Sequence, residues 1–250
     1  MLSDSNSEWF KDWFNSPYYH ILYKNRSFVE ADLFISNLAN YFSFKKEDII
    51  LDLGCGKGRH SFSLNKYAER VIGLDLASES IKEANAIKGN ALYPDFRVGD
   101  MRSFQIEFKF DYILNLFTSF GYFDSLVDNQ NVIDTVAKHL EEEGIFVMDY
   151  LNSEKVRQNG PSEEVKVIDG IEFQLKKTLD ANFVYKNIEF EVNSKKYNFT
   201  ERVQLFEIES LQKMFEKSGF SVIENFGDYN LNPYFNDSDR MILVGKKETY

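Results

Sequence analysis

The stretch LDLGCGKGRH at residues 51–60 constrains this chain strongly, because it places three glycines directly after a run of apolar residues. Glycine costs backbone entropy on folding, so a loop this bare indicates that something must approach the backbone closely. A strand, a glycine-rich turn and a helix together bring bare backbone and a helix N-terminus to one place. The stretch therefore predicts a site for a nucleotide-like ligand.

The spacing of the glycines distinguishes between the known kinds of nucleotide loop. They fall at positions 54, 56 and 58, giving G-x-G-x-G, which fits neither the phosphate loop of NTPases nor the dinucleotide fingerprint G-x-G-x-x-G. Asp52, just before the first glycine, would repel a pyrophosphate but suits a cationic amino group. Asp75 ends the next predicted strand, 17 residues beyond Gly58, where a carboxylate can bind ribose hydroxyls. The alternative role for Asp75 is a helix cap without a ligand.

Apolar runs that alternate with helical spacing predict an α/β fold with a parallel sheet covered on both faces. The predicted strands span 48–53, 70–75, 95–98, 110–115 and 145–150. The predicted helices span 27–43, 59–67 and 127–142, and a further one begins with Ser78 as its cap. Between about 163 and 206 apolar residues recur at every second position, which predicts antiparallel strands with one face exposed to solvent. A helix at 208–218 and strands at 220–226 and 240–245 complete the pattern.

These shifts in pattern divide the chain, which is expected to fold as one domain over residues 1–250. The predicted parts are a helical leader or lid at 1–44, a cofactor-binding core at 45–155, a β-rich insertion at 160–206 and a C-terminal completion of the sheet at 207–250.

Four motifs in the core resemble those of the class I S-adenosylmethionine-dependent methyltransferases. They are LDLGCGKG at 51–58, GLDL at 73–76, GDM at 99–101 and FDYI at 110–113. The resemblance implies a Rossmann-like, doubly wound sheet of seven mostly parallel strands with a reversed last strand. It also implies that the antiparallel insertion follows the fifth strand, as in members of the group that act on small molecules.

The resemblance implies S-adenosylmethionine as the cofactor and assigns its methionine part to the glycine loop. Asp52 would lie near the amino group of the cofactor, and Asn115 and Leu116 would border its sulfonium. The loop residues expected to approach the methionine part are Gly54, Cys55, Gly56 and Gly58.

The nucleoside part of the cofactor is assigned in the same way. Asp75 would hold the ribose, and Leu76 would pack on the adenine. Asp100 would accept a hydrogen bond from the adenine amino group, with the backbone of Met101 beside it.

The leader sequence PYYHILYKNR supplies the candidates for catalysis. In similar enzymes a tyrosine-bearing N-terminal segment closes over the cofactor, so Tyr18 and Tyr23 are expected beside it. Tyr19 and His20 are the candidate catalytic residues, although His20 has a structural alternative. Positioning alone can supply roughly 7–11 kcal/mol of the barrier to methyl transfer, and a base helps only where the acceptor carries a proton.

The predicted substrate pocket lies beyond the carboxyl ends of the fourth and fifth strands. Its expected residues are Phe117, Phe120, Tyr122, Asp149 and Asn152. The alternative for the aromatic residues is packing under the following helix. Arg240, at the start of the last strand, is expected to be a solvated charge.

Composition limits the partners. The net charge of −11 disfavours nucleic acid, whose phosphates attract basic faces. Three scattered histidines and one cysteine show no metal-ligand spacing, so no metal is expected. The single cysteine indicates a reducing cytoplasm. No segment approaches the roughly 20 apolar residues of a membrane span, and the oligomeric state is left as monomer or homodimer.

The sequence thus predicts an S-adenosylmethionine-dependent methyltransferase acting on N, O or C of a small molecule. The alternatives are an RNA methyltransferase, a cofactor-binding interaction module without catalysis and, least favoured by the glycine spacing, an NAD-type oxidoreductase.

Overall fold

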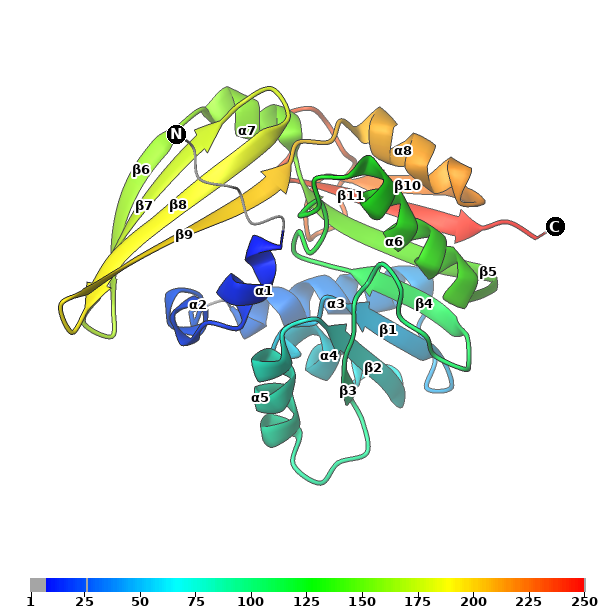
Figure 1. Cartoon of the computed structure of the whole chain (residues 1–250). Helices are drawn as coiled ribbons and strands as arrows, with labels where there is room; N and C mark the ends of the chain where they lie inside the picture. Colours follow the sequence, from blue (N-terminus) through cyan, green and yellow to red (C-terminus); the bar gives the residue numbers. More distant parts are fainter. Residues whose placement is uncertain (1–7, 26, 250) are drawn as a thin grey trace.

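The computed structural model describes residues 8–25 and 27–249, and its strands form two sheets (Figure 1). The larger sheet contains β1 (Ile49–Leu53), β2 (Arg70–Asp75), β3 (Asp95–Val98), β4 (Phe110–Asn115), β5 (Leu140–Leu151), β10 (Phe220–Phe226) and β11 (Arg240–Lys247). The smaller contains β6 (Ser162–Ile168), β7 (Ile171–Leu179), β8 (Phe183–Val192) and β9 (Lys195–Gln204). The helices are α1 (Trp9–Phe14), α2 (Pro17–Leu22), α3 (Phe28–Phe42), α4 (Arg59–Leu64), α5 (Ser78–Lys88), α6 (Leu126–His139), α7 (Ser153–Asn159) and α8 (Ile208–Lys217).

The larger sheet has the strand order β10-β11-β5-β4-β1-β2-β3. Strand β11 runs antiparallel to both β5 and β10, while β1 to β5 pair in parallel. The predicted seven-stranded, doubly wound sheet with a reversed last strand is therefore confirmed.

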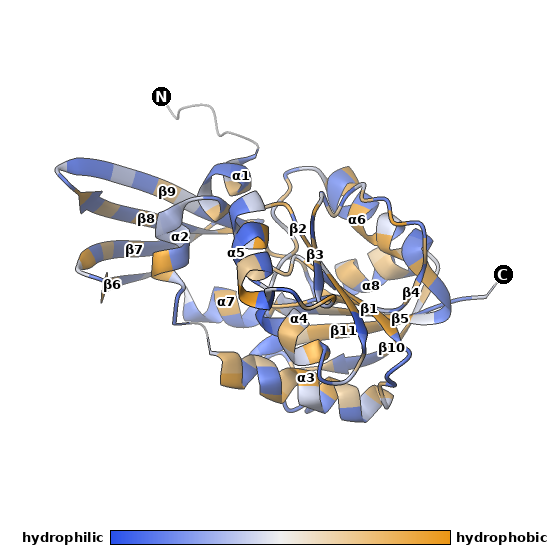
Figure 2. Ribbon diagram, turned by 90° about the horizontal axis from the view of Figure 1, so that it is seen from below, coloured by the Kyte–Doolittle hydropathy of each residue, from blue (hydrophilic) through white to orange (hydrophobic). Residues whose placement is uncertain are grey.

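Helices cover both faces of this sheet, which explains why its central strands are apolar runs without alternation. Figure 2 shows the hydrophobic residues gathered along these strands, between the helices. On one face, α6 and α8 contribute Val132 and Phe215 to the largest core cluster. On the other face, α3 contributes Phe34 and Leu38 to a second cluster.

The helix predicted over 59–67 ends at Leu64, and two further predicted helix boundaries also differ from the structure. The helix predicted over 127–142 ends at His139, because Leu140 already pairs with Phe110 of β4 and belongs to β5. Ser78 is the first helical residue of α5 and not its cap; Ala77 occupies the cap position. Both errors arise where strand pairing or backbone geometry overrides the local signal.

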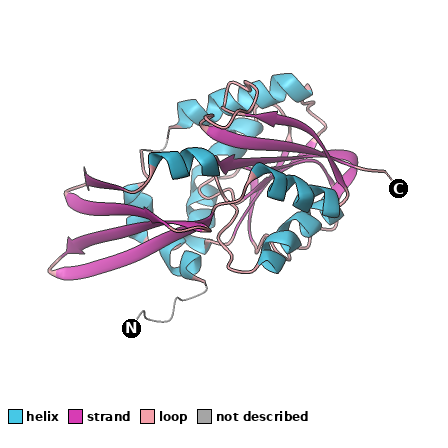
Figure 3. Cartoon of the chain, turned by 90° about the horizontal axis from the view of Figure 1, so that it is seen from above, coloured by secondary structure: helices cyan, strands magenta, loops and turns pink. Residues whose placement is uncertain are grey.

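The smaller sheet is antiparallel throughout and projects from one side of the molecule (Figure 3). The predicted antiparallel insertion is confirmed, with strands over 162–204. Its inner face carries Phe173, Ile188 and Phe190, which pack against Trp13 and Leu22 of the leader. Helices α1 and α2 therefore lie under the small sheet, and residues 1–7 and 26 of the predicted leader lie outside the described part of the chain.

A buried ion pair joins β5, β11 and the loop after β4. Asp149 is fully buried and accepts hydrogen bonds from Arg240 Nε at 2.7 Å, Phe117 N at 2.7 Å and the Tyr229 hydroxyl at 3.0 Å. Arg240 also donates to Thr118 Oγ1 at 2.7 Å. Phe117 and Thr118 both have left-handed backbone conformations, with φ of 59° and 57°, so this pair holds a strained turn. The expectation that Arg240 is a solvated charge was wrong, because its partners, on the neighbouring strand β5 and in the loop after β4, are distant in sequence.

We predict that Asp149→Ala destabilises the protein by about 3–5 kcal/mol, because it leaves Arg240 and Phe117 N without their buried partner. Urea unfolding would measure this loss. Asp239→Ala, which removes an exposed carboxylate from its surface ion pair with Lys155, is the control and should cost no more than about 1 kcal/mol. A loss for Asp149→Ala no larger than that of the control would contradict the structural role of the pair.

A second buried carboxylate lies under the glycine loop. Asp52, in β1, is 1% exposed and accepts a hydrogen bond from Ser61 Oγ of α4 at 2.6 Å. Burial raises the pKa of Asp52 to about 7, with the neighbouring charge of Asp75 adding to the effect and the Ser61 bond opposing it. The native state therefore binds a proton at the Asp52 carboxylate far more tightly than an unfolded chain does.

Because the pKa of Asp52 is raised on folding from 3.8 to about 7, its contribution to stability is full at low pH and is lost as the pH rises through 7. The slope approaches about 1.4 kcal/mol per pH unit between these values. We predict that Asp52→Asn removes this part of the pH dependence. Urea unfolding of both proteins between pH 5.5 and 8 should show curves that converge or cross, and parallel curves would contradict the buried, protonated carboxyl.

Candidate functional site

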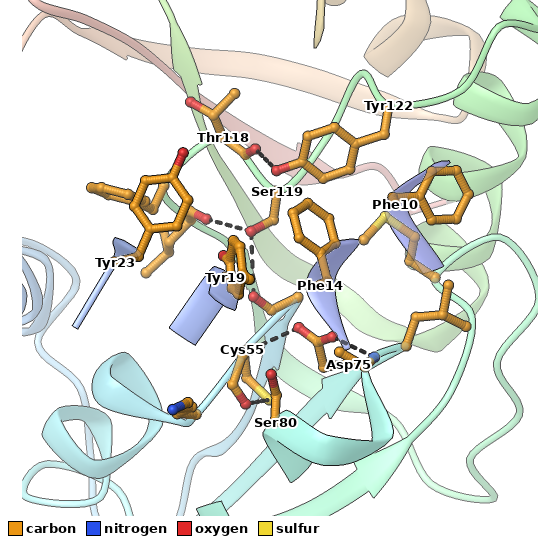
Figure 4. A pocket seen from close by; sticks show the side chains of 18 of the residues that line it. Phe10, Phe14, Tyr19, Tyr23, Cys55, Asp75, Ser80, Thr118, Ser119 and Tyr122 are labelled. Atoms are coloured by element: carbon orange, nitrogen blue, oxygen red, sulfur yellow. Dashed lines mark hydrogen bonds between the residues drawn. The ribbon is translucent and has the colours of Figure 1, made fainter. Parts of the chain in front are cut away.

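A cavity of about 600 Å³ lies between the leader, the carboxyl ends of the parallel strands and β9. This is where open α/β sheets bind ligands, because the loops after the strands diverge there. In Figure 4, Asp75, Cys55 and Ser80 lie at one side of the cavity, and Tyr23 and Thr118 lie toward the other. The cavity therefore brings core, leader and insertion together.

The glycine loop between β1 and α4 forms one wall. All three glycines have positive φ, of 82°, 54° and 82°. A Cβ at Gly54 would lie 2.6 Å from Cβ of Ser119, and one at Gly58 would lie 2.4 Å from the Phe96 ring, whereas a Cβ at Gly56 would meet no described atom within 4 Å. Gly54 and Gly58 are thus required by packing, and Gly56 presents bare backbone to the cavity.

Asp75, at the end of β2, points at this loop. Its Oδ2 accepts a hydrogen bond from Gly56 N and its Oδ1 from Ala77 N, both at 2.8 Å (Figure 4). Burial raises the pKa of Asp75. Each carboxylate oxygen has a further lone pair, so Asp75 organises the start of α5 and also faces the cavity, where Leu76 and Cys55 join it.

The loop after β3 forms the next part of the wall, with Asp100 and Met101 lining the cavity. The Asp100 carboxylate binds the Arg102 guanidinium through contacts of 2.6 to 3.1 Å. Burial alone would raise the pKa of Asp100, but the hydrogen bonds and charge of Arg102 outweigh it and lower that pKa. Asp100 is therefore ionised and forms an ion pair with Arg102.

Four residues predicted to bind the cofactor do not line the cavity. Asp52 lies beneath the loop on Ser61, and Gly58 packs on Phe96. Asn115 is fully buried and donates to Leu53 O at 2.8 Å, so it ties β4 to β1. Leu116, its neighbour, does line the cavity.

Tyr18, the fourth, faces the small sheet. Its hydroxyl lies 3.2 Å from that of Tyr197, and its ring packs against Phe190. Tyr18 therefore anchors the leader on the insertion.

The other leader residues do face the cavity. Tyr19, His20 and Tyr23 line it, and the Tyr19 ring lies 5.0 Å from the rings of both Phe14 and Tyr23. His20 Nε2 is 4.0 Å from the carboxylate of Glu83. The two candidate catalytic residues thus occupy the same wall.

The predicted substrate residues divide into two groups. Phe117 and Tyr122 line the cavity. Phe120 is fully buried in the core, Asp149 is buried in the ion pair described above, and Asn152 caps α7 and bonds to backbone oxygens of the loop before β11. These last three lie outside the cavity, because the core, the ion pair and the start of α7 take up their side chains, which sequence alone does not show.

Glu201, in β9, is a cavity residue that the sequence analysis missed. Its Oε1 accepts hydrogen bonds from Trp13 Nε1 and the Tyr23 hydroxyl, both at 2.7 Å. Lys186 Nζ in turn donates to the Tyr23 hydroxyl at 2.7 Å. The only sequence signal is the period of two, which puts Glu201 on the same face as Phe199.

Across residues 8–25 and 27–249, no three His, Cys, Asp or Glu side chains are grouped so as to hold a metal ion. Nor does any described helix combine the length and apolar character needed to cross a membrane.

Comparisons with known proteins agree with this geometry. A family model described as a methyltransferase domain matches residues 44–219. The dTDP-3-amino-3,4,6-trideoxy-alpha-D-glucopyranose N,N-dimethyltransferase of Streptomyces venezuelae is 29% identical over 100 residues, or 40% of this chain and 41% of that protein. The match thus spans less than half of that relative.

Two solved structures share the fold. An S-adenosylmethionine-dependent methyltransferase from Clostridium acetobutylicum has a TM-score of 0.80 at 20% identity, covering 93% of this chain and 96% of its own. Streptomyces venezuelae DesVI has a TM-score of 0.73 at 22% identity, covering 92% and 97%. Because the family model covers more than half of the 250 residues, and the fold and glycine loop agree with it, the chain belongs to the methyltransferase domain family and has the fold of the class I S-adenosylmethionine-dependent methyltransferases.

Proposed function

We propose that this protein transfers a methyl group from S-adenosylmethionine to N, O or C of a small-molecule acceptor. One observation carries the proposal: a continuous cavity joins the bare backbone of Gly56 and the carboxylate of Asp75 to the aromatic side chains of the leader. A ligand at the glycine loop and a second molecule beside the leader would share this space. The volume, about 600 Å³, is typical of small-molecule sites.

The residues at the glycine loop fit the cofactor. Gly56 leaves room for it, Asp75 offers acceptor lone pairs to ribose hydroxyls, and Leu76 and Met101 give apolar surface for a base. When bound, the cofactor supplies a methyl group already activated on a sulfonium. The protein then has to align the acceptor and exclude water, which is how positioning lowers a barrier.

The remaining surface of the cavity suits a small acceptor. Phe117 and Tyr122 line it from the core, and Tyr19 and Val203 line it from the leader and the insertion. The net charge of −11 weighs against an RNA acceptor. The dTDP-3-amino-3,4,6-trideoxy-alpha-D-glucopyranose N,N-dimethyltransferase named above supports the same choice. The single buried cysteine supports a cytoplasmic location. A monomer or homodimer is compatible with this site.

Methyl uptake tests the proposal. The protein is incubated with S-adenosylmethionine carrying a labelled methyl group and with a panel of amines, phenols and carboxylates. Transfer of the label to a panel member supports the proposal, provided that protein denatured by heat transfers none. Label incorporated only into added RNA would overturn the small-molecule assignment.

Asp75→Ala should weaken the binding of S-adenosylhomocysteine by about 1–3 kcal/mol, since hydrogen bonds to a charged acceptor are lost. Isothermal titration gives this value directly. Asp237→Ala, an exposed carboxylate outside the cavity, serves as the control. Equal affinities for the two variants would remove Asp75 from the ribose role.

Tyr19→Phe and His20→Ala should each lower turnover of an acceptor found in the panel, while the affinity for S-adenosylhomocysteine changes less than about threefold. The reason is that both side chains lie on the leader wall of the cavity, where they would contact the acceptor. Full activity in both variants would show that the leader does not act in catalysis.

A further inference from the structure

The groups that donate directly to the Glu201 carboxylate in the cavity are neutral. Lys186 pairs with Glu201 across β8 and β9 and donates to the Tyr23 hydroxyl at 2.7 Å, but it does not line the cavity. Trp13 Nε1 donates to Oε1 at 2.7 Å, and the Tyr23 hydroxyl lies 2.7 and 2.8 Å from the two oxygens. Such bonds fix the direction of the carboxylate, but they do not neutralise its charge as a bound cation would. Glu201 is half-buried and lines the cavity, so it presents an oriented negative charge to whatever binds there.

The surface next to Glu201 is a chain of aromatic rings. Tyr23 lies 5.0 Å from Tyr19, which lies 5.0 Å from Phe14, and Phe14 lies 5.3 Å from Tyr122. All four residues line the cavity. The faces of aromatic rings attract cations, and the attraction is stronger where water is excluded. A carboxylate at the end of an aromatic wall is the arrangement that recognises a substituted ammonium group.

The positive residues of the cavity wall are, by contrast, already matched with carboxylates. Each of them lies within 4 Å of an acidic partner: Lys11 on Glu8, Lys24 on Asp169, Lys57 on Glu83, Arg59 on Glu30 and Arg240 on Asp149. An anionic acceptor would therefore gain little from them, and it would be repelled by Glu201. The charge pattern favours a cation over an anion.

We propose that Glu201 determines the acceptor specificity, and that the acceptor is an alkylamine whose nitrogen lies against Glu201 and the leader rings. This inference rests on the proposed methyl transfer and narrows its acceptor atom to nitrogen. Glu201 belongs to β9 of the insertion. The insertion would therefore contribute to the choice of substrate as well as cover the cavity.

Methyl transfer requires the neutral form of the amine. An alkylamine is an ammonium ion at neutral pH and reacts only after it loses a proton. That proton passes to water before the nitrogen attacks. The free nitrogen lone pair then forms the new N–C bond while the electron pair of the broken C–S bond stays with sulfur. One proton is released for each methyl group transferred.

The test compares an amine with an alcohol of similar shape. The probes are N-methylcyclohexylamine and cyclohexanol, titrated into the protein saturated with S-adenosylhomocysteine at pH 7.5 and followed by protein NMR shifts. The variants are Glu201→Gln, which removes the charge, and Glu201→Asp, which keeps it. Glu189→Gln removes an equal charge from the exposed face of the small sheet and is the matched control.

In wild type and in Glu189→Gln the amine should bind at least tenfold more tightly than the alcohol. Glu201→Gln should reduce this ratio to near one without changing the affinity for S-adenosylhomocysteine, and Glu201→Asp should keep a preference for the amine. Equal binding of both probes, no amine binding, or an unchanged ratio in Glu201→Gln would overturn the inference. If S-adenosylhomocysteine itself fails to bind wild type, the proposed function fails first.

Discussion

The hydrogen bond from Gly56 N to the Asp75 carboxylate is the contact on which the cavity depends. It connects the loop after β1 to the end of β2, and two further bonds, from Gly54 N and Cys55 N to Leu74 O at 2.7 and 3.1 Å, hold the same corner. A loop with three positive φ values is stable only where its amide groups find such partners. The corner thereby keeps Gly56 bare toward the cavity and turns Asp75 to face it.

The rest of the cavity is built from segments that are distant in sequence. The leader does not pack only on the core: Trp13 and Leu22 enter a cluster with Phe173 and Phe190 of the small sheet. Leader and insertion thus share an apolar interior and close the same side of the cavity. On the other side, the buried pair of Asp149 and Arg240 fixes the strained turn that lines it. Each wall is therefore secured by contacts that do not involve the ligand.

The core could be predicted from sequence because its signals are local. Strand, glycine turn and helix follow one another within 16 residues, from Ile49 to Leu64, and Asp75 follows from where β2 ends. Phe120 and Asn152 were placed in the pocket by the same strand-end rule, yet packing draws both elsewhere. The rule predicts where a backbone segment lies, but it does not predict the direction in which its side chains point.

Other features depended on tertiary contacts alone. Arg240 was expected in solvent because nothing near it in sequence carries its partner, Asp149, which lies on the neighbouring strand. Glu201 lies in a polar, alternating strand, and its face of that strand is an inner one because the leader packs against it. Residues that come from an insertion carry no motif, so the acceptor side of this site could not be predicted from the sequence as the cofactor side could.

We propose that the corner formed by Gly56 and Asp75 holds the nucleoside and methionine of S-adenosylmethionine. Calorimetric titration of the purified protein, freed of carried-over ligand, with S-adenosylhomocysteine and separately with NAD tests it most directly. We expect micromolar or tighter binding of S-adenosylhomocysteine and no heat with NAD. Binding of NAD without binding of S-adenosylhomocysteine would contradict it.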